Sequence, residues 1–332
     1  MAADEASLTA ALALPCDMAM PLRIAVASMV LSRQVRPRCP TWITGIGPDQ
    51  AQLKAASHGY GFLATASNLT LENIDLIGFD TGVGPGVGVY PQLRRVPGSQ
   101  SRSWQAARCG HTHTRHLASS DRPMCAHRRS SAVAVEEGAG MVRISRCRFE
   151  RNHGSDGGAL AAGPGVRLRV EASLFVSNRA EVHGGAIFHR GGRGASPVPL
   201  EVLDSTFRFN SAQFGGGVEA YYARVRVLRS VFVANHAQFG GTALRVYGGC
   251  PADCCACPSG CPCHEVSDGV VSRWPVHVEA SRFVHNLGGR TCEGCAVSLN
   301  GPSATLHNNT YLPPERNPQA RLVKSSGKLR IS

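Results

Sequence analysis

One phrase recurs five times along this 332-residue chain, and it constrains the fold more than any other feature. The phrase is Phe-x-x-Asn, a short polar link, a Gly pair and an apolar run, as in "SVFVANHAQFGGTALRV" from Ser230 to Val246. Steps of 26, 32, 25 and 51 residues separate the phenylalanines that begin the copies, Phe149, Phe175, Phe207, Phe232 and Phe283. Since such periods are typical of solenoids, we interpret the copies as stacked repeats of one structural unit.

The residues before each Phe alternate as the residues of a half-buried strand do. Seven positions before the Phe stand Val142, Leu168, Leu200, Val225 and Val276. Five positions before it stand Ile144, Val170, Val202, Val227 and Val278. Between these apolar columns lie Arg143, Arg169, Glu201, Arg226 and His277. The alternation predicts one strand per repeat with an apolar inner face and a polar outer face.

Two weaker copies extend the series, one with Leu69, Leu71 and Leu76 and one with Ala304, Leu306 and Tyr311 in the corresponding places. A unit with one apolar face cannot bury it alone, but stacked copies can. We therefore expect an all-β protein, a right-handed parallel β-helix (a pectin-lyase-like solenoid) of about seven coils over residues 42–313. Residues 1–41 are expected to form an amino-terminal segment that either caps the solenoid or is incomplete, and residues 314–332 a basic tail.

In such a stack, matching residues become vertical neighbours about 4.8 Å apart. Phe is expected above Phe in the interior, where each contributes about 1.5–3 kcal/mol. The asparagines are expected to form an amide ladder at a turn, and the set comprises Asn152, Asn178, Asn210, Asn235 and Asn286. The Gly pairs suit a sharp bend or a close approach of two backbones.

The repeat resembles that of the chlamydial-type polymorphic outer-membrane proteins, in which F-x-x-N is followed by G-G-A-[ILV]. All five Phe/Asn pairs match the first half, and the runs Gly157 to Leu160 and Gly184 to Ile187 match the second half fully. The resemblance covers residue 141 to about residue 313. It implies a right-handed β-helix used in surface display or adhesion, and it implies no catalytic residues. The membrane β-barrel of the bacterial members has no counterpart in this sequence.

The formal net charge is +12, but its location argues against nucleic-acid binding. Residues 94–130 hold eight Arg and one Asp, and residues 313–332 hold five basic residues and one Glu. These two segments carry eleven of the twelve net charges, and the repeats show no basic and aromatic face of the kind that binds nucleic acid. The apolar stretches of the first forty residues are too short and interrupted for a membrane span, and they lack the basic start of a good secretory signal.

Two segments interrupt the repeat. Residues 80–131 are rich in Arg, Gly, Ser and Pro without a strand or helix period, so they are a functional loop, a disordered segment or an artefact of the gene model. Residues 250–273 form a Cys-rich loop, and three alternatives stay open for its thiols: disulfides, a zinc-type metal site or unpaired cysteines. The candidates are Cys250, Cys254, Cys255, Cys257, Cys261 and Cys263. Thirteen cysteines in total leave at least one thiol free or paired with another chain.

The outward column suggests the function. Arg143, Arg169, Arg226 and His277 stand on four of five successive rungs and form a candidate face for an anionic polysaccharide. A paired-acid hydrolase is poorly supported, since the column holds one carboxylate, Glu201. We expect a secreted or cell-surface β-helix protein without a cofactor, structural, adhesive or glycan-binding, with polysaccharide or another surface protein as partner. The alternative is a carbohydrate-active enzyme, a polysaccharide lyase or glycoside hydrolase, on the same fold.

Overall fold

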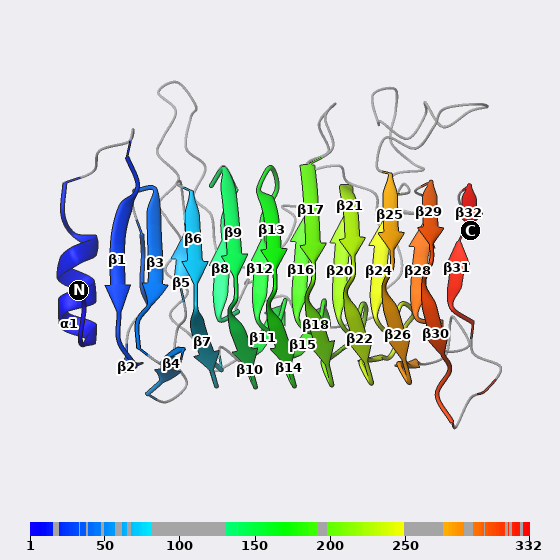
Figure 1. The fold of residues 1–332 in the computed structure, drawn as a ribbon, viewed down its shortest axis with the longest axis horizontal. Coiled ribbons are helices and arrows are strands. Elements are labelled where there is room, and N and C mark those ends of the chain that lie inside the picture. Colours follow the sequence, from blue (N-terminus) through cyan, green and yellow to red (C-terminus); the bar gives the residue numbers. More distant parts are fainter. Residues whose placement is uncertain are drawn as a thin grey trace, which may run out of the picture.

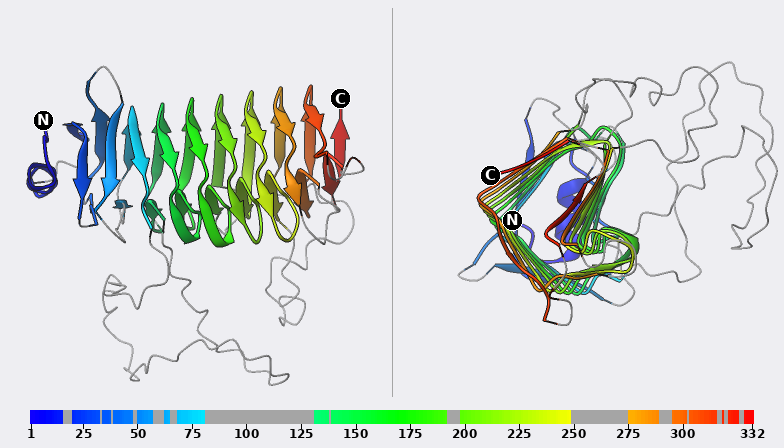
Figure 2. Two further views of the ribbon diagram at one scale, coloured as in Figure 1. Left: turned by 90° about the horizontal axis from the view of Figure 1, so that it is seen from below. Right: turned by 90° about the vertical axis from the view of Figure 1, so that its right-hand side faces the viewer.

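The computed structural model of the chain shows an elongated right-handed parallel β-helix, as the repeat predicts (Figure 1). It describes residues 1–15, 20–32, 34–37, 39–47, 50–56, 62–64, 68–80, 131–137, 139–191, 198–248, 275–288, 295–301, 303–315, 318, 321–325 and 328–332. The two ends of the chain lie at opposite ends of the rod, and successive coils superimpose when the rod is viewed along its axis (Figure 2).

Within the described residues the strands form four parallel sheets, named here A to D. Sheet A has ten strands: β1 (Leu22–Val26), β3 (Thr41–Gly45), β6 (Leu69–Glu72), β9 (Met141–Ser145), β13 (Arg167–Glu171), β17 (Val198–Leu203), β21 (Ala223–Leu228), β25 (Val276–Glu279), β29 (Ala304–His307) and β32 (Leu329–Ile331). Sheet B has nine: β2 (Met29–Leu31), β4 (Ala51–Ala55), β7 (Ile74–Ile77), β10 (Arg148–Glu150), β14 (Leu174–Val176), β18 (Thr206–Arg208), β22 (Val231–Val233), β26 (Arg282–Val284) and β30 (Thr310–Leu312).

Sheet C has eight described strands: β5 (Phe62–Ala64), β8 (Val133–Val135), β12 (Leu160–Ala162), β16 (Ile187–Arg190), β20 (Val218–Tyr221), β24 (Leu244–Tyr247), β28 (Val297–Asn300) and β31 (Val323–Ser325). Sheet D has five: β11 (His153–Asp156), β15 (Arg179–His183), β19 (Ser211–Ala212), β23 (His236–Ala237) and β27 (Leu287–Gly288). A full coil therefore runs through sheets A, B, D and C in turn, and each strand pairs with its counterparts one coil away.

The repeat phenylalanines stack in the interior of sheet B. Neighbouring ring centroids are 4.8, 4.7, 4.8 and 5.1 Å apart from Phe149 to Phe283, and the ring planes differ by 6° or less. All five side chains are fully buried. The apolar columns of sheet A face the same interior, so the core is one continuous column of side chains.

The asparagines form a hydrogen-bonded ladder where each coil leaves sheet B. The Asn178 Nδ2 donates to Asn210 Oδ1 at 3.0 Å and also to the carbonyl oxygen of Phe149 at 3.0 Å. The Asn178 backbone N–H donates to the same Asn210 Oδ1 at 3.0 Å. The pattern repeats on each rung from Asn152 to Asn286, so the amides satisfy buried backbone groups at the turn.

A second ladder, which the sequence analysis did not identify, runs two residues before each Phe. The backbone N–H of Ser173 donates to Ser205 Oγ, and that of Ser205 donates to Ser230 Oγ, at 3.1 and 3.2 Å. Ser281 continues this ladder and Asn309 ends it. The signal was present in the sequence as Ser-x-Phe in four of the five copies.

In the pairs that begin at Gly157, Gly184 and Gly215, the two glycines have different reasons to be glycine. Gly157, Gly184 and Gly215 have positive φ, between 58° and 66°, which glycine adopts at little cost. At the second position a side chain would collide with the next coil, because a Cβ on Gly185 would lie 2.1 Å from the carbonyl oxygen of Gly216. The sequence predicted a bend or a close approach, and the structure contains one of each.

The strands extend beyond the expected range 42–313 at both ends. β1 precedes residue 42 and pairs with β3, and β31 and β32 lie within the expected tail and pair with β28 and β29. Helix α1 (Glu5–Leu12) lies over the first coil, with Leu8 and Leu12 buried. These terminal strands lack the Phe-x-x-Asn phrase, so the repeat pattern alone does not reveal them.

The two insertions expected from sequence fall almost wholly outside the described residues. Of 80–131 the structure describes Asp80 and Ser131, and of 250–273 it describes none. The six candidate ligands or disulfide partners from Cys250 to Cys263 therefore lie outside the described part. Among the residues that the structure describes, no helix is long and apolar enough to cross a membrane.

Candidate functional site

The outward residues of sheet A form a line along the rod. Strand register places Arg143 beside Arg169, Arg169 beside Glu201, Glu201 beside Arg226 and Arg226 beside His277. The line continues with Thr70 on one side and Thr305 on the other. Because neighbouring strands lie about 4.8 Å apart, its side chains present charges at regular intervals on one face.

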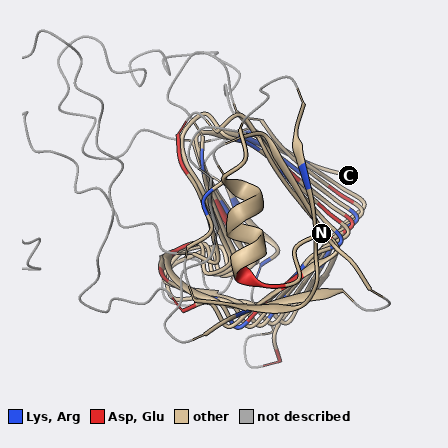
Figure 3. Cartoon of the chain, turned by 90° about the vertical axis from the view of Figure 1, so that its left-hand side faces the viewer, with Lys and Arg blue, Asp and Glu red and all other residues tan. Residues whose placement is uncertain are grey.

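Glutamates partly neutralise this line. Arg169 pairs with Glu171 at 3.0 Å and with Glu201 at 3.7 Å, and Arg226 approaches Glu201 at 3.9 Å. His277 Nε2 lies 2.9 Å from Glu279 Oε2. Glu171 and Glu279 belong to a further outward column, so the face holds more carboxylates than the single one counted from sequence. Figure 3 shows the resulting interleaving of basic and acidic positions.

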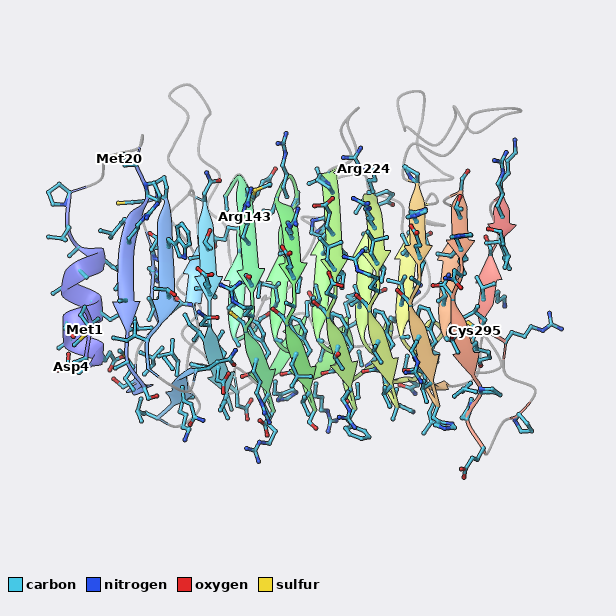
Figure 4. The ribbon with its side chains drawn as sticks, viewed as in Figure 1. Met1, Asp4, Met20, Arg143, Arg224 and Cys295 are labelled. Atoms are coloured by element: carbon cyan, nitrogen blue, oxygen red, sulfur yellow. The ribbon has the colours of Figure 1, made fainter. Side chains whose placement is uncertain are left out.

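A neighbouring outward column adds cations that the sequence analysis did not include. Arg167 and Arg224 lie two residues before Arg169 and Arg226 on the same strands, and both are exposed. Among the described residues Arg143, Arg167 and Arg224 have no ion-pair partner within 4 Å. Figure 4 labels Arg143 and Arg224, which come from the same sheet. Sheet A thus presents paired and unpaired arginines together.

A different cluster lies on the outer side of sheet C, next to sheet D. Its centre is Glu219 on β20, which points away from the main core and is nevertheless fully buried. Arg245 on β24 donates to Glu219 Oε1 through Nη1, and His183 Nδ1 on β15 lies 3.0 Å from Glu219 Oε2. The same Arg245 nitrogen also donates to the Tyr221 hydroxyl at 3.3 Å. We call these four residues the Glu219 cluster.

The charge of Glu219 shifts the pKa values of its three partners in the cluster. Burial alone would lower the pKa of His183, but the hydrogen bond to Glu219 and the charge of Glu219 outweigh it, so the pKa is raised. Burial opposes the charge of Arg245 as well, yet the Glu219 carboxylate holds the pKa of that guanidinium above its usual value. The pKa of Tyr221 is raised, chiefly by burial and then by the Glu219 charge. Tyr221 therefore stays neutral beside the Glu219–Arg245 ion pair.

Aromatic rings surround the Glu219 cluster. The His183 ring lies 5.1 Å from Phe188, 5.6 Å from Phe214 and 5.5 Å from Tyr221. The Arg245 guanidinium carbon lies 4.5 Å from the centroid of Phe214, a cation–π distance. Tyr247 lies 5.4 Å from Tyr221, and Phe239 lies 5.3 Å from Phe214. The repeat comparison missed this cluster because its charged residues, His183, Glu219 and Arg245, have no like residue on the neighbouring rungs.

Another histidine on sheet C serves a different purpose. His189 on β16 points into the main core and is fully buried. Its Nε2 donates to the carbonyl oxygen of Val166 at 2.8 Å, while Nδ1 has no partner among the described residues. Burial lowers the pKa of His189 to about 4, so the imidazole is neutral at pH 7. It is a structural residue with one unsatisfied atom.

Two of the three described cysteines, Cys39 and Cys147, are structural. Cys39 is disulfide-bonded, and Cys147 is buried with its pKa raised to about 12 by that burial. Since the thiolate is the reactive form, Cys147 is inert at neutral pH. No group of three or more His, Cys, Asp or Glu suited to a metal occurs in the described part of the chain.

Comparisons with known proteins add no family assignment. No family model matches the chain, and a search of curated proteins finds no match. The resemblance to the polymorphic outer-membrane protein repeat therefore remains a prediction from the Phe-x-x-Asn and Gly-Gly pattern. What the structure defines is a class by fold, the right-handed parallel β-helix.

Proposed function

We propose that this protein is a non-catalytic extracellular or cell-surface β-helix that binds acidic polysaccharide along sheet A. The observation that carries the proposal is the arginine-rich outer face of four consecutive strands, β9, β13, β17 and β21. This face presents Arg143, Arg167, Arg169, Arg224 and Arg226 against two carboxylates, Glu171 and Glu201. A guanidinium can bond a carboxylate or sulfate through two parallel N–H groups.

The ion pairs on this face do not prevent binding. An exposed Arg–Glu pair contributes about 0–1 kcal/mol, so exchanging Glu201 for a ligand carboxylate costs little. Arg143, Arg167 and Arg224 need no such exchange. A linear polyanion that lies along the rod axis would meet cations on β9, β13 and β21, with Glu201 on the intervening strand β17. Several such weak contacts would add up to useful affinity.

An extracellular location is part of the proposal, and two observations support it. Cys39 is disulfide-bonded, and disulfides persist mainly in oxidising compartments. The chain also has 13 cysteines. A long rod with a repeated surface suits structural or adhesive use, which is also what the family resemblance implies.

The proposal can be tested with an oligogalacturonate long enough to span several coils. In isothermal titration calorimetry at low salt, we expect binding to wild type. Combined replacement of Arg143, Arg167 and Arg224 by Gln is expected to weaken it about tenfold or more. The matched control replaces three exposed arginines on sheets B and D, Arg179, Arg208 and Arg282, and should bind as wild type does. The proposal fails if wild type does not bind or if both triple variants weaken binding equally.

The same protein samples decide between binding and catalysis. An enzyme of the lyase or hydrolase class would release unsaturated products or reducing ends from polygalacturonate, and Arg169→Ala and Arg226→Ala would abolish that release. We expect no turnover by wild type. Turnover that these substitutions remove would contradict the non-catalytic role and favour the carbohydrate-active enzyme.

A further inference from the structure

The Glu219 cluster breaks the rule that organises the rest of the rod. In the Phe, Asn and Ser ladders the same residue recurs on each rung, because like residues stack well on each other. The outward column through Glu219 instead changes at every rung, and reads Ala161, Phe188, Glu219, Arg245 and Ser298. The stacking of coils does not require these residues, so another reason is needed for them.

The centre of the cluster is rigid and has no net charge. The Glu219 carboxylate balances the Arg245 guanidinium, and His183 contributes a charge only when it is protonated. In strand register, Asp156 stands beside His183 and Arg190 beside Tyr221, and these two charges also cancel. Glu219 has an exposed fraction of 0%, whereas the His183 and Arg245 side chains are 19% and 17% exposed. The donors that reach the surface are thus held in place by a carboxylate below them.

The rim of the cluster is aromatic. Phe214, Tyr221, Phe239 and Tyr247 are each partly exposed, and they come from consecutive coils of the rod. Phe188 and Tyr222 pack beneath them and are buried. The whole chain has 11 phenylalanines, 6 tyrosines and 3 tryptophans, and five phenylalanines are used in the interior stack. Six of the remaining aromatic residues therefore gather at one place on the outside.

From this arrangement we infer that the Glu219 cluster and its aromatic rim form a binding site for an uncharged sugar ring. Ligand sites typically combine aromatic surface with a few fixed polar groups. A pyranose ring offers an apolar C–H face to stack on Tyr247, and its hydroxyl groups can accept from Arg245 and exchange hydrogen bonds with the Tyr221 hydroxyl. His183 Nε2 makes no hydrogen bond within the described residues, and the His183 ring lies against Phe214 and Tyr221.

The charge balance separates this site from sheet A. An acidic sugar would gain little from a centre in which Arg245 and His183 already share the Glu219 carboxylate, and breaking a buried ion pair is costly. A neutral sugar leaves the pair intact. Protein interfaces are also rich in Tyr and Arg. A stable protein interface, however, buries a much larger area than the few residues of the Glu219 cluster and its rim provide, so a sugar ring is the better fit.

The experiment uses the full chain and a panel of uncharged oligosaccharides: cello-, manno-, xylo-, malto- and chitohexaose. Saturation-transfer NMR should detect at least one of them. Tyr247→Ala should weaken that binding about two- to tenfold, because it removes the ring on which the sugar stacks. The control Phe209→Ala removes a ring that is 53% exposed on another side of the rod, and it should leave binding unchanged.

Every outcome decides the question. Absence of binding to all five sugars, equal binding by Tyr247→Ala and wild type, or binding of oligogalacturonate in competition at this site would overturn the inference. If Tyr247→Ala does not fold, wild-type chemical shifts replace it: the Tyr247, Tyr221 and His183 ring resonances should move on adding sugar while those of Phe209 should not. The variant without Arg143, Arg167 and Arg224 should keep neutral-sugar binding, so failure of the sheet A proposal would be distinguishable.

Discussion

At the residue scale, the amide ladder stabilises the fold in a way that single contacts do not. Each rung depends on both neighbours: Asn210 accepts two hydrogen bonds from Asn178 and donates to Asn235 and to the carbonyl oxygen of Phe175. All these groups are buried, and a buried donor or acceptor left without a partner costs about 1–3 kcal/mol. The middle rungs are therefore more sensitive to substitution than the end rungs.

Asn210→Ala is expected to lower the free energy of unfolding by about 3 kcal/mol, because it leaves the buried backbone N–H of Asn178 without its acceptor and removes the hydrogen bonds to the Asn178 side chain and to the carbonyl oxygen of Phe175. Urea denaturation followed by circular dichroism measures the change. Gln213→Ala, on the exposed part of the same coil, is the control and should stay within about 0.5 kcal/mol of wild type. A small effect of Asn210→Ala would mean that the ladder contributes little.

His189 makes the fold sensitive to acid. Its pKa is about 4 in the folded chain, below the ordinary 6.5, so the unfolded chain binds the proton more tightly. The neutral imidazole of His189 therefore contributes fully to the free energy of unfolding above pH 6.5. This contribution is lost as the pH falls toward 4, and the loss is at most about 3 kcal/mol. His189→Leu removes this loss. Denaturation of both proteins between pH 7 and pH 4 tests the prediction, and parallel stability curves would contradict it.

At the element scale, the corners of each coil use left-handed backbone without glycine. Three residues before the Phe, the residues Arg146, Ala172, Asp204, Arg229 and Ala280 have φ between 46° and 52°. Arg229 and Asp204 compensate with an ion pair at 2.7 Å, and the Arg229 guanidinium lowers the pKa of the Asp204 carboxyl. Ala172 and Ala280 have no polar side chain to do the same, so these corners hold local strain.

Ala172→Gly should therefore stabilise the protein by about 0.5–1 kcal/mol, since glycine removes the left-handed penalty and the backbone N–H still donates to Leu203. Ala162→Gly, in the buried strand β12, should have the opposite sign because strand glycine adds entropy to the unfolded chain and leaves a void. Thermal denaturation of both variants checks the pair. The same sign for both would show that corner strain is unimportant.

The sequence could predict those elements that repeat. Phe207 or Val202 is one of several like residues in a column, so its position and its inward direction follow from the alignment. The serines of the Ser ladder also recur in the sequence. A recurring serine is common in loops, however, and its role is recognised only when the backbone N–H that donates to its hydroxyl oxygen is known. Glu219 could not be found in this way, because its partners His183 and Arg245 lie 36 and 26 residues away and appear once.

At the scale of the whole molecule, the rod separates a repeated interior from a variable surface. The interior repeats, so that each coil is stabilised by its neighbours. The outside varies, with arginines along sheet A and aromatic residues beside sheet D. α1 covers one end of the stack, where otherwise the first coil would expose its inner face. Such an arrangement lets the surface change from rung to rung without loss of the fold.

The central claim is that the sheet A arginines act as a row of cationic contacts for a linear polyanion. The dependence of oligogalacturonate affinity on salt tests it most directly, because each cation that contacts the ligand adds to the slope of log K against log salt. The slope is negative, and the account predicts that its magnitude falls by somewhat less than one for each of Arg143→Gln, Arg167→Gln and Arg224→Gln. The slope should not change for Arg208→Gln or Arg282→Gln. Equal slopes for all five variants and wild type would contradict it.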